Sequence, residues 1–233
     1  MGKSVMLITG TRKGIGRFLA EYYIEKGFHV VGCSRTESDF VNKDYEHYCL
    51  DVADEGQVKN LFRNIQKDLG RLDVLLNNAG VASMNHILLT PLKTVTTLFN
   101  TNFVGTFLFC RESAKLMMKN KSGRIVNFAS VATPLKLEGE AIYASSKAAV
   151  INLTQIMSKE LAPLGITVNA IGLTPVETDL IKSVPKEKKD ALLSMLSIKR
   201  YGKPEDISNV VDFLIKNESD FITGQTIYLG GIS

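Results

Sequence analysis

The sequence is poor in cysteine and contains no tryptophan. Its three cysteines, Cys33, Cys49 and Cys110, are an odd number without Cys-x-x-Cys spacing, which argues against a disulfide framework and against a cysteine-ligated metal site. We expect them to be reduced thiols in a reducing compartment. No apolar run reaches the ~18 residues of a membrane span, and the first residues lack the apolar core and cleavage site of a signal peptide. These absences predict a cytoplasmic protein with no membrane partner.

A strong excess of one charge is also missing. Lys and Arg number 28 against 24 Asp and Glu, and the basic residues are spread along the chain. A nucleic-acid-binding protein would gather them on one face, so nucleic acid is not expected as a partner. Apolar residues make up 45% of the chain, which excludes a disordered protein. The histidines, His29, His47 and His86, have no metal-ligand spacing, so no metal site is predicted, and a surface role is favoured for His86.

Segments with the patterns of strands and helices alternate along the whole chain. The strand segments are apolar throughout, which is typical of strands buried on both faces of a parallel sheet. Repeated strand–helix units predict a single-domain α/β protein over residues 1–233, with a Rossmann-type, doubly wound parallel sheet of about seven strands and helices on both faces. The predicted strands are 4–8, 28–33, 46–50, 74–76, 124–128, 166–171 and 226–229, and the main predicted helices are 15–26, 58–65, 94–119 and 141–161. The irregular stretch 175–199 is predicted to be a solvated surface or a lid over a substrate cleft.

A glycine-rich segment separates the first predicted strand from the first helix. From Thr9 to Gly16 it reads Thr-Gly-Thr-Arg-Lys-Gly-Ile-Gly. Glycines let the backbone turn tightly and approach a phosphate, while the helix N-terminus offers free N–H groups and the positive end of the helix dipole. This context predicts a dinucleotide-binding loop, although such a turn also serves only to connect two elements. The residues predicted to bind the cofactor here are Gly10, Arg12, Lys13, Gly14, Ile15 and Gly16.

The residues after the second predicted strand indicate which dinucleotide is bound. A carboxylate there would bind the ribose 2′-hydroxyl of NAD and repel a 2′-phosphate. This chain has Ser34-Arg35-Thr36, with no carboxylate before Glu37. Arg35, beside Ser34, is predicted to hold a 2′-phosphate together with the bases of the adjacent loop. We therefore favour NADP(H) and leave NAD(H) open, because these bases could also be ordinary surface residues.

Tyr143 and Lys147 share one face of a predicted helix, since they are four residues apart. A free tyrosine has a pKa of about 10, and a neighbouring ammonium favours the phenolate and lowers that pKa. The two residues are a candidate general acid/base, or else a common surface pair.

Two further polar residues point to the same site. Ser130 ends a predicted strand 13 residues before Tyr143, at the sheet edge where ligands bind, though it could also cap the following turn. Asn102 interrupts a mostly apolar helix, although it could also be satisfied locally.

These motifs resemble the short-chain dehydrogenase/reductase family in its single-domain branch, and chiefly members similar to 3-oxoacyl-(acyl-carrier-protein) reductases. The resemblance covers nearly the whole chain and rests on Thr9 with the Gly-x-x-x-Gly-x-Gly spacing, on Asn77-Asn78-Ala79-Gly80, and on segments 200–207 and 222–225. It implies an NADP(H)-dependent oxidoreductase that interconverts a carbonyl and a secondary alcohol. It also implies a homo-oligomer, a tetramer or a dimer.

The resemblance assigns roles to individual residues. Ser130 would polarise the substrate oxygen, and Tyr143 would transfer its proton. Lys147 would lower the pKa of Tyr143 and bind the nicotinamide ribose, while Asn102 would complete the proton relay through a water molecule. Cofactor contacts are implied for Tyr143, Lys147, Asp51, Val52, Asn78, Ala79, Gly80, Val176 and Thr178.

One departure from the family pattern affects the expected site. Leu173 and Thr174 stand where the family usually has Pro-Gly, which changes backbone freedom beside the nicotinamide. We expect the lid hinge and the substrate pocket to be affected more than cofactor binding. The substrate is left open among a 3-oxoacyl thioester, a sugar or polyol, and another small ketone.

A different class of function also stays open. The alternative is a catalytically silent nucleotide-binding sensor or scaffold, against which the presence of all four residues argues. An epimerase or dehydratase is disfavoured, because that chemistry generally uses a separate substrate domain.

Overall fold

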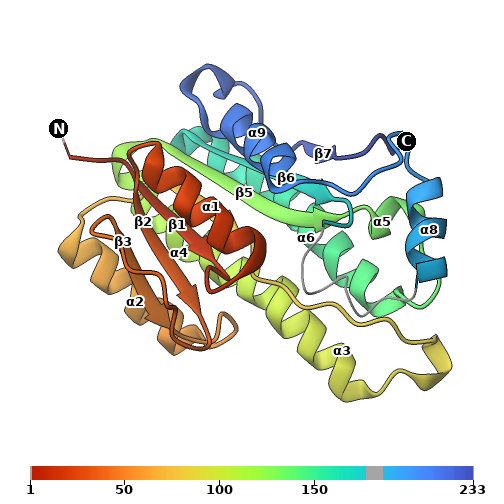
Figure 1. Ribbon diagram of the computed structural model, residues 1–233. Helices are drawn as coiled ribbons and strands as arrows, with labels where there is room; N and C mark the ends of the chain where they lie inside the picture. Colours follow the sequence, from red (N-terminus) through yellow and green to blue (C-terminus); the bar gives the residue numbers. More distant parts are fainter. Residues whose placement is uncertain (1, 177–185, 233) are drawn as a thin grey trace.

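The central strands are buried on both faces, as their unbroken apolar runs predict. All five residues of β1 (Val5–Thr9) and all eight of β5 (Gly123–Ser130) are buried. In the computed structural model, which describes residues 2–176 and 186–232, they lie in a seven-stranded sheet of order β3-β2-β1-β4-β5-β6-β7. Each neighbouring pair of strands is parallel. The predicted α/β, Rossmann-type doubly wound sheet is therefore confirmed (Figure 1).

The other strands are β2 (His29–Ser34), β3 (Tyr45–Cys49), β4 (Val74–Asn77), β6 (Ile166–Leu173) and β7 (Thr226–Tyr228). The helices are α1 (Gly14–Glu25), α2 (Glu55–Asp68), α3 (Leu92–Phe99), α4 (Gly105–Met117), α5 (Ala132–Leu135), α6 (Ala141–Leu161), α8 (Lys186–Ser194) and α9 (Pro204–Ile215). The predicted strands and helices match these elements to within a few residues at their ends. One predicted helix differs: the stretch 94–119 is divided by a π-helical turn at Asn100–Val104.

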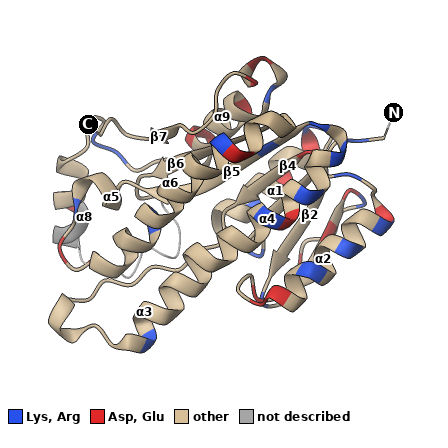
Figure 2. Cartoon of the chain, turned by 180° about the vertical axis from the view of Figure 1, so that it is seen from behind, with Lys and Arg blue, Asp and Glu red and all other residues tan. Residues whose placement is uncertain are grey.

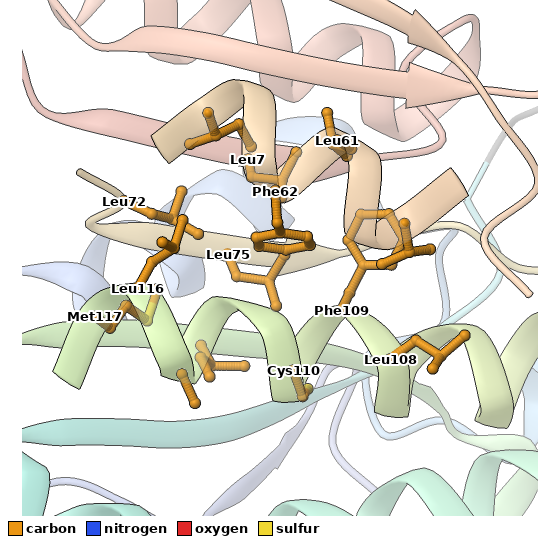
Figure 3. Packing of buried hydrophobic residues seen from close by; sticks show 14 of the residues in the cluster. Leu7, Leu61, Phe62, Leu72, Leu75, Leu108, Phe109, Cys110, Leu116 and Met117 are labelled. Carbon is orange, nitrogen blue, oxygen red and sulfur yellow. The ribbon is translucent and has the colours of Figure 1, made fainter. Parts of the chain in front are cut away.

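Two hydrophobic clusters bind helices to opposite faces of the sheet. On one face, Phe62 of α2 stacks edge-on against Phe109 of α4, over Leu75 of β4 (Figure 3). On the other face, Leu19 of α1 and Val211 of α9 pack against the sheet. The side chains named here are buried, and burying each large apolar side chain contributes roughly 1.5–3 kcal/mol to the stability of the fold. Helices on both faces leave only the edges of the sheet free for a ligand.

The order in which the strands are added across the sheet reverses between β1 and β4. Strands β2 and β3 follow β1 on one side of this point and β4 to β7 lie on the other, while all seven strands point the same way. In open parallel sheets, ligands bind beyond the carboxyl ends of the strands at such a switch point. The residues that follow β1, β4 and β5 therefore belong to one edge, which is where the sequence predicts the site.

Charged residues of both signs are interspersed on the helices, for example along α2 and α4 (Figure 2). Cys33, Cys49 and Cys110 are all free thiols. Within residues 2–176 and 186–232, no helix has the length and apolar character to cross a bilayer, and no cluster of His, Cys, Asp or Glu suits a metal ion. Of the predicted lid at 175–199, residues 177–185 lie outside the described structure, while α8 forms within its second half.

Candidate active site

Two glycines shape the loop after β1, one through its positive φ and the other through a close contact with the backbone. Gly10 has a φ of +78°, which disfavours any side chain there. At Gly16 an added Cβ would stand 2.2 Å from the Gly10 carbonyl oxygen and 2.5 Å from Asn78 Nδ2. Helix α1 begins behind this loop with no side-chain cap at Lys13 and no acidic residue in its first turn. The structure thus places an uncapped helix N-terminus beside glycines, which suits an anionic diphosphate.

The Asn-Asn-Ala-Gly segment after β4 is hydrogen-bonded to this loop. Asn78 Nδ2 donates to the carbonyl oxygens of Thr9 at 2.8 Å and Gly10 at 3.3 Å. The Ala79 N–H donates to Thr9 Oγ1 at 2.9 Å. The segment is therefore more than a β-turn, because it fixes the ends of β1 and β4 to each other.

The residues predicted to bind the adenosine half surround the ends of β2 and β3. Ser34 ends β2, and Arg35 is exposed directly after it, as is Arg12 in the loop after β1. Asp51 is exposed beyond β3, where its Oδ1 accepts the Ala53 N–H at 2.9 Å. Val52 is buried next to it. All of these residues lie on the carboxyl side of the sheet.

Ser130, Tyr143 and Lys147 converge at the carboxyl end of β5. Ser130 is the last residue of that strand, and its hydroxyl is hydrogen-bonded to the Tyr143 phenol. Lys147, one turn further along α6, is 5% exposed, and its Nζ donates to the Phe128 carbonyl oxygen at 2.8 Å. The helix spacing brings phenol and ammonium to one face, and the strand end supplies the hydroxyl.

The pKa values of the phenol and the ammonium are both shifted by burial. Burial raises the pKa of Tyr143 to about 12, with the hydrogen bond from Ser130 lowering it in part and Glu140 raising it further. Burial lowers the pKa of Lys147 to about 8. Burial outweighs the other influences on the Tyr143 phenol, and the expectation that Lys147 lowers its pKa stays a prediction.

Asn102 is fully buried in the π-helical turn between α3 and α4. Its Oδ1 accepts the Val81 N–H and its Nδ2 donates to the Val81 carbonyl oxygen, both at 2.9 Å. Nδ2 also donates to Ser146 Oγ at 3.0 Å, and Ser146 donates to the Tyr143 carbonyl oxygen. Asn102 thus connects the segment after β4 with helix α6. The role of Ser146 was missed from the sequence, although its place between Tyr143 and Lys147 was a signal.

Gly80 separates Asn102 from Lys147. A Cβ at Gly80 would lie 3.3 Å from Asn102 Oδ1 and 3.4 Å from Lys147 Nζ. Both polar atoms therefore border one small volume beside the backbone of Gly80. The predicted tetrad is brought to one edge of the sheet, with Asn102 and Lys147 on either side of this volume.

The Leu173-Thr174 pair is accommodated without strain. Leu173 ends β6 and pairs with Ser130, while Thr174 is buried, and neither residue has a positive φ. The backbone here does not use the freedom that Gly would provide. Val176 follows as a buried residue bridged to Gly202, and Thr178 lies outside the described residues.

The loop that contains His86 contacts the segment just before α6. The Asn85 N–H donates to the Gly139 carbonyl oxygen at 2.8 Å. His86 is exposed, and its Nδ1 accepts the Leu88 N–H, so its role is local. A cavity of about 320 Å³ lies between residues 81–83 and α3, but none of the four predicted catalytic residues lines it. We do not assign the substrate to that cavity, since a substrate must reach Tyr143.

Comparisons with known proteins agree over almost the full chain. A family model described as enoyl-(acyl carrier protein) reductase matches residues 10–232. The 3-oxoacyl-(acyl-carrier-protein) reductase FabG of Vibrio cholerae is 32% identical, covering 97% of this chain and 96% of that protein. FabG of Staphylococcus aureus is 33% identical with the same coverage. The solved structure of ElxO with NADP bound has a TM-score of 0.89 at 32% identity, covering 97% of each chain.

Proposed function

The chain belongs to the short-chain dehydrogenase/reductase family, and from that membership we propose that it is an NADP(H)-dependent reductase of a small ketone or a 3-oxoacyl thioester. The family makes it an NAD(P)-dependent oxidoreductase acting on CH–OH and carbonyl groups. One observation supports the finer proposal: a hydroxyl, a phenol and a buried ammonium meet at the sheet edge that also bears the glycine loop.

The coenzyme is proposed from the chemistry of the residues at that edge. The uncapped N-terminus of α1 suits a diphosphate. Exposed Arg12 and Arg35 suit a 2′-phosphate. The related ElxO structure contains NADP, and NADP(H) is therefore favoured over NAD(H). When bound, NADPH supplies the hydride.

The protein's own residues handle the substrate oxygen and its proton. The Ser130 and Tyr143 hydroxyls would both hydrogen-bond a carbonyl oxygen placed between them. Because the pKa of Tyr143 is raised to about 12, the phenol stays protonated at neutral pH and donates its proton to the developing alkoxide. Lys147, with a pKa lowered to about 8, is mostly charged at pH 7 and stabilises negative charge beside Tyr143. Asn102 holds the Val81 segment and α6 at a fixed separation.

Carbonyl reduction uses the neutral phenol of Tyr143, which the raised pKa favours. A 3-oxoacyl thioester is the substrate that the FabG relatives suggest. A sugar, a polyol and another small ketone are the alternative substrates, and an assay with all of these compounds distinguishes them.

The assembly and location are proposed on separate grounds. Phe107 on α4 and Ile156 on α6 are exposed apolar residues, at 38% and 48%, which suits a homotetramer or dimer built on these helices. The free thiols Cys33, Cys49 and Cys110 suit a cytoplasmic enzyme. Residues 175–199 are proposed as the substrate lid.

The substitution Tyr143→Phe tests the function. We expect NADPH oxidation with a panel of 3-oxoacyl thioesters, sugars and ketones to fall by about 10²-fold or more, while the Kd for NADPH changes less than about twofold. Tyr48→Phe is the matched control, because its hydroxyl contacts only Glu46 among the bonds described and lies on edge strand β3. Unchanged turnover in Tyr143→Phe would contradict the proposal, and NADPH binding without turnover by the wild type would favour a sensor.

A further inference from the structure

A chain of hydrogen bonds lies beneath the adenosine end of the site and joins three strands. The Tyr45 hydroxyl oxygen lies 2.8 Å from Thr11 Oγ1 and 2.7 Å from His47 Nδ1. The other ring nitrogen, His47 Nε2, lies 3.0 Å from Ser34 Oγ and 3.2 Å from the Thr36 carbonyl oxygen. The chain therefore runs from the loop after β1, through β3, to the turn after β2.

The packing around these groups leaves no room for a side chain at Gly32 of β2. An added Cβ there would stand 2.3 Å from Thr11 Oγ1 and 2.3 Å from the Tyr45 hydroxyl oxygen. Thr11 is fully buried, so its hydroxyl depends on protein partners. A glycine inside a buried strand thus admits the cluster, and the hydrogen bonds are part of the packed structure.

The direction of one hydrogen bond follows from chemistry. The Thr36 carbonyl oxygen can only accept, so His47 Nε2 carries a hydrogen and donates. The Ser34 hydroxyl donates to the same carbonyl oxygen at 2.7 Å. His47 therefore holds both Ser34 and Thr36, and Arg35 is the residue between them.

The carboxylates that follow Arg35 in the sequence, Glu37 and Asp39, already interact with other side chains. The Cys49 thiol is hydrogen-bonded to Glu37, and this contact raises the pKa of Cys49. Asp39 pairs with Arg17 at 2.7 Å. Within the described residues Arg35 has no ion pair, and its exposed guanidinium is free for an anion. The backbone on either side of Arg35 is held by the Ser34 hydroxyl and by His47, which contacts both flanking residues.

We propose that His47 is a positioning residue that holds Arg35 for the 2′-phosphate, and thereby sets the preference for NADP(H) over NAD(H). This inference rests on the proposed function, in which NADP(H) is the coenzyme. Arg35 would contact the phosphate directly, and His47 would act through the Ser34–Thr36 turn. Because the turn is already held in a single conformation, Arg35 loses less conformational entropy when it binds the phosphate.

A double-mutant cycle on coenzyme binding tests the proposal. The Kd values of NADPH and NADH are measured by nucleotide fluorescence for the wild type, Arg35→Ala, His47→Leu and the double variant. For His47→Leu we expect NADPH to bind about tenfold more weakly, or about 1.4 kcal/mol, and NADH to change less than about twofold. In the Arg35→Ala background, His47→Leu should add less than about twofold.

Two further variants separate positioning from general stability. His47→Gln, whose amide can donate to the Thr36 carbonyl oxygen, should recover most of the NADPH affinity. His29→Leu is the matched control, since it breaks a similar bridge to Glu46 at the other end of β2 and β3. This control should leave the ratio of the two Kd values unchanged.

The outcomes separate the role of His47 from the identity of the coenzyme. Equal weakening of NADPH and NADH by His47→Leu overturns the inference, as does full additivity with Arg35→Ala. A wild-type protein that prefers NADH by about tenfold overturns the proposed coenzyme, and the inference with it. Selective, non-additive loss of NADPH binding supports both.

Discussion

A methyl group added at Gly80 is expected to shift the pH dependence of the enzyme. The added Cβ would lie 3.4 Å from Lys147 Nζ and 3.3 Å from Asn102 Oδ1. Gly80 is not among the glycines with positive φ, so its backbone accepts alanine. These contacts are tight, and the neighbours must move by only a few tenths of an ångström. Gly80→Ala should therefore fold and place carbon against a buried ammonium.

The size of the effect follows from the pKa of Lys147. Burial already lowers it to about 8. If the methyl group removes a further 1.4 kcal/mol of stabilisation of the charged form, the pKa falls by about one unit. The charged fraction at pH 8 then drops from about one half to about one tenth. At pH 7 it drops from about nine tenths to about one half.

The assay is kcat/KM for NADPH-dependent carbonyl reduction between pH 6 and pH 9.5. We expect the alkaline limb of Gly80→Ala to move down by about one pH unit, with about fivefold lower activity at pH 8 and about twofold at pH 7. Gly56→Ala in α2 is the matched control, because its Cβ also meets a polar atom at 3.3 Å, which belongs to Asp54 and not to a catalytic residue. An unmoved limb, or an equal loss at every pH, would refute the electrostatic reasoning.

Two other predictions concern stability. Because the folded pKa of Lys147 is about 8 and its ordinary value is 10.5, the unfolded chain binds more protons between these values, and folding stability should rise by about 2 kcal/mol from pH 8 to pH 10. Urea unfolding of Lys147→Met should lack this rise; a rise of equal size in the variant would count against the shift. Asn127 is buried and bonds Asn77 Nδ2 at 2.8 Å and Thr154 Oγ1 at 2.9 Å. Asn127→Leu should lower the free energy of unfolding by about 2 kcal/mol, with exposed Asn64→Leu as control, and an equally stable Asn127→Leu protein would contradict the role of this network.

Local sequence was sufficient wherever a feature depends on neighbouring residues. The unbroken apolar runs predicted parallel strands buried on both faces, and the glycine spacing predicted the turn between β1 and α1. Tyr143 and Lys147 share a face because helix geometry alone requires it. Asn102 was noticed because helices disfavour asparagine, but its hydrogen bonds to Val81 and Ser146 join segments that lie far apart in the chain.

The tertiary structure decided what depends on residues far apart in the chain. The raised pKa of Tyr143 arises from burial by several elements, which no short motif contains. His47 read as an isolated histidine, and its place beneath Arg35 exists only because β2 and β3 pair with Ser34 next to Cys49. Sequence fixes the period of side chains along a strand or helix, and so determines the elements and the candidate groups. Packing fixes the distances and the loss of water between elements, and these set the proton affinities and the shape of the coenzyme site.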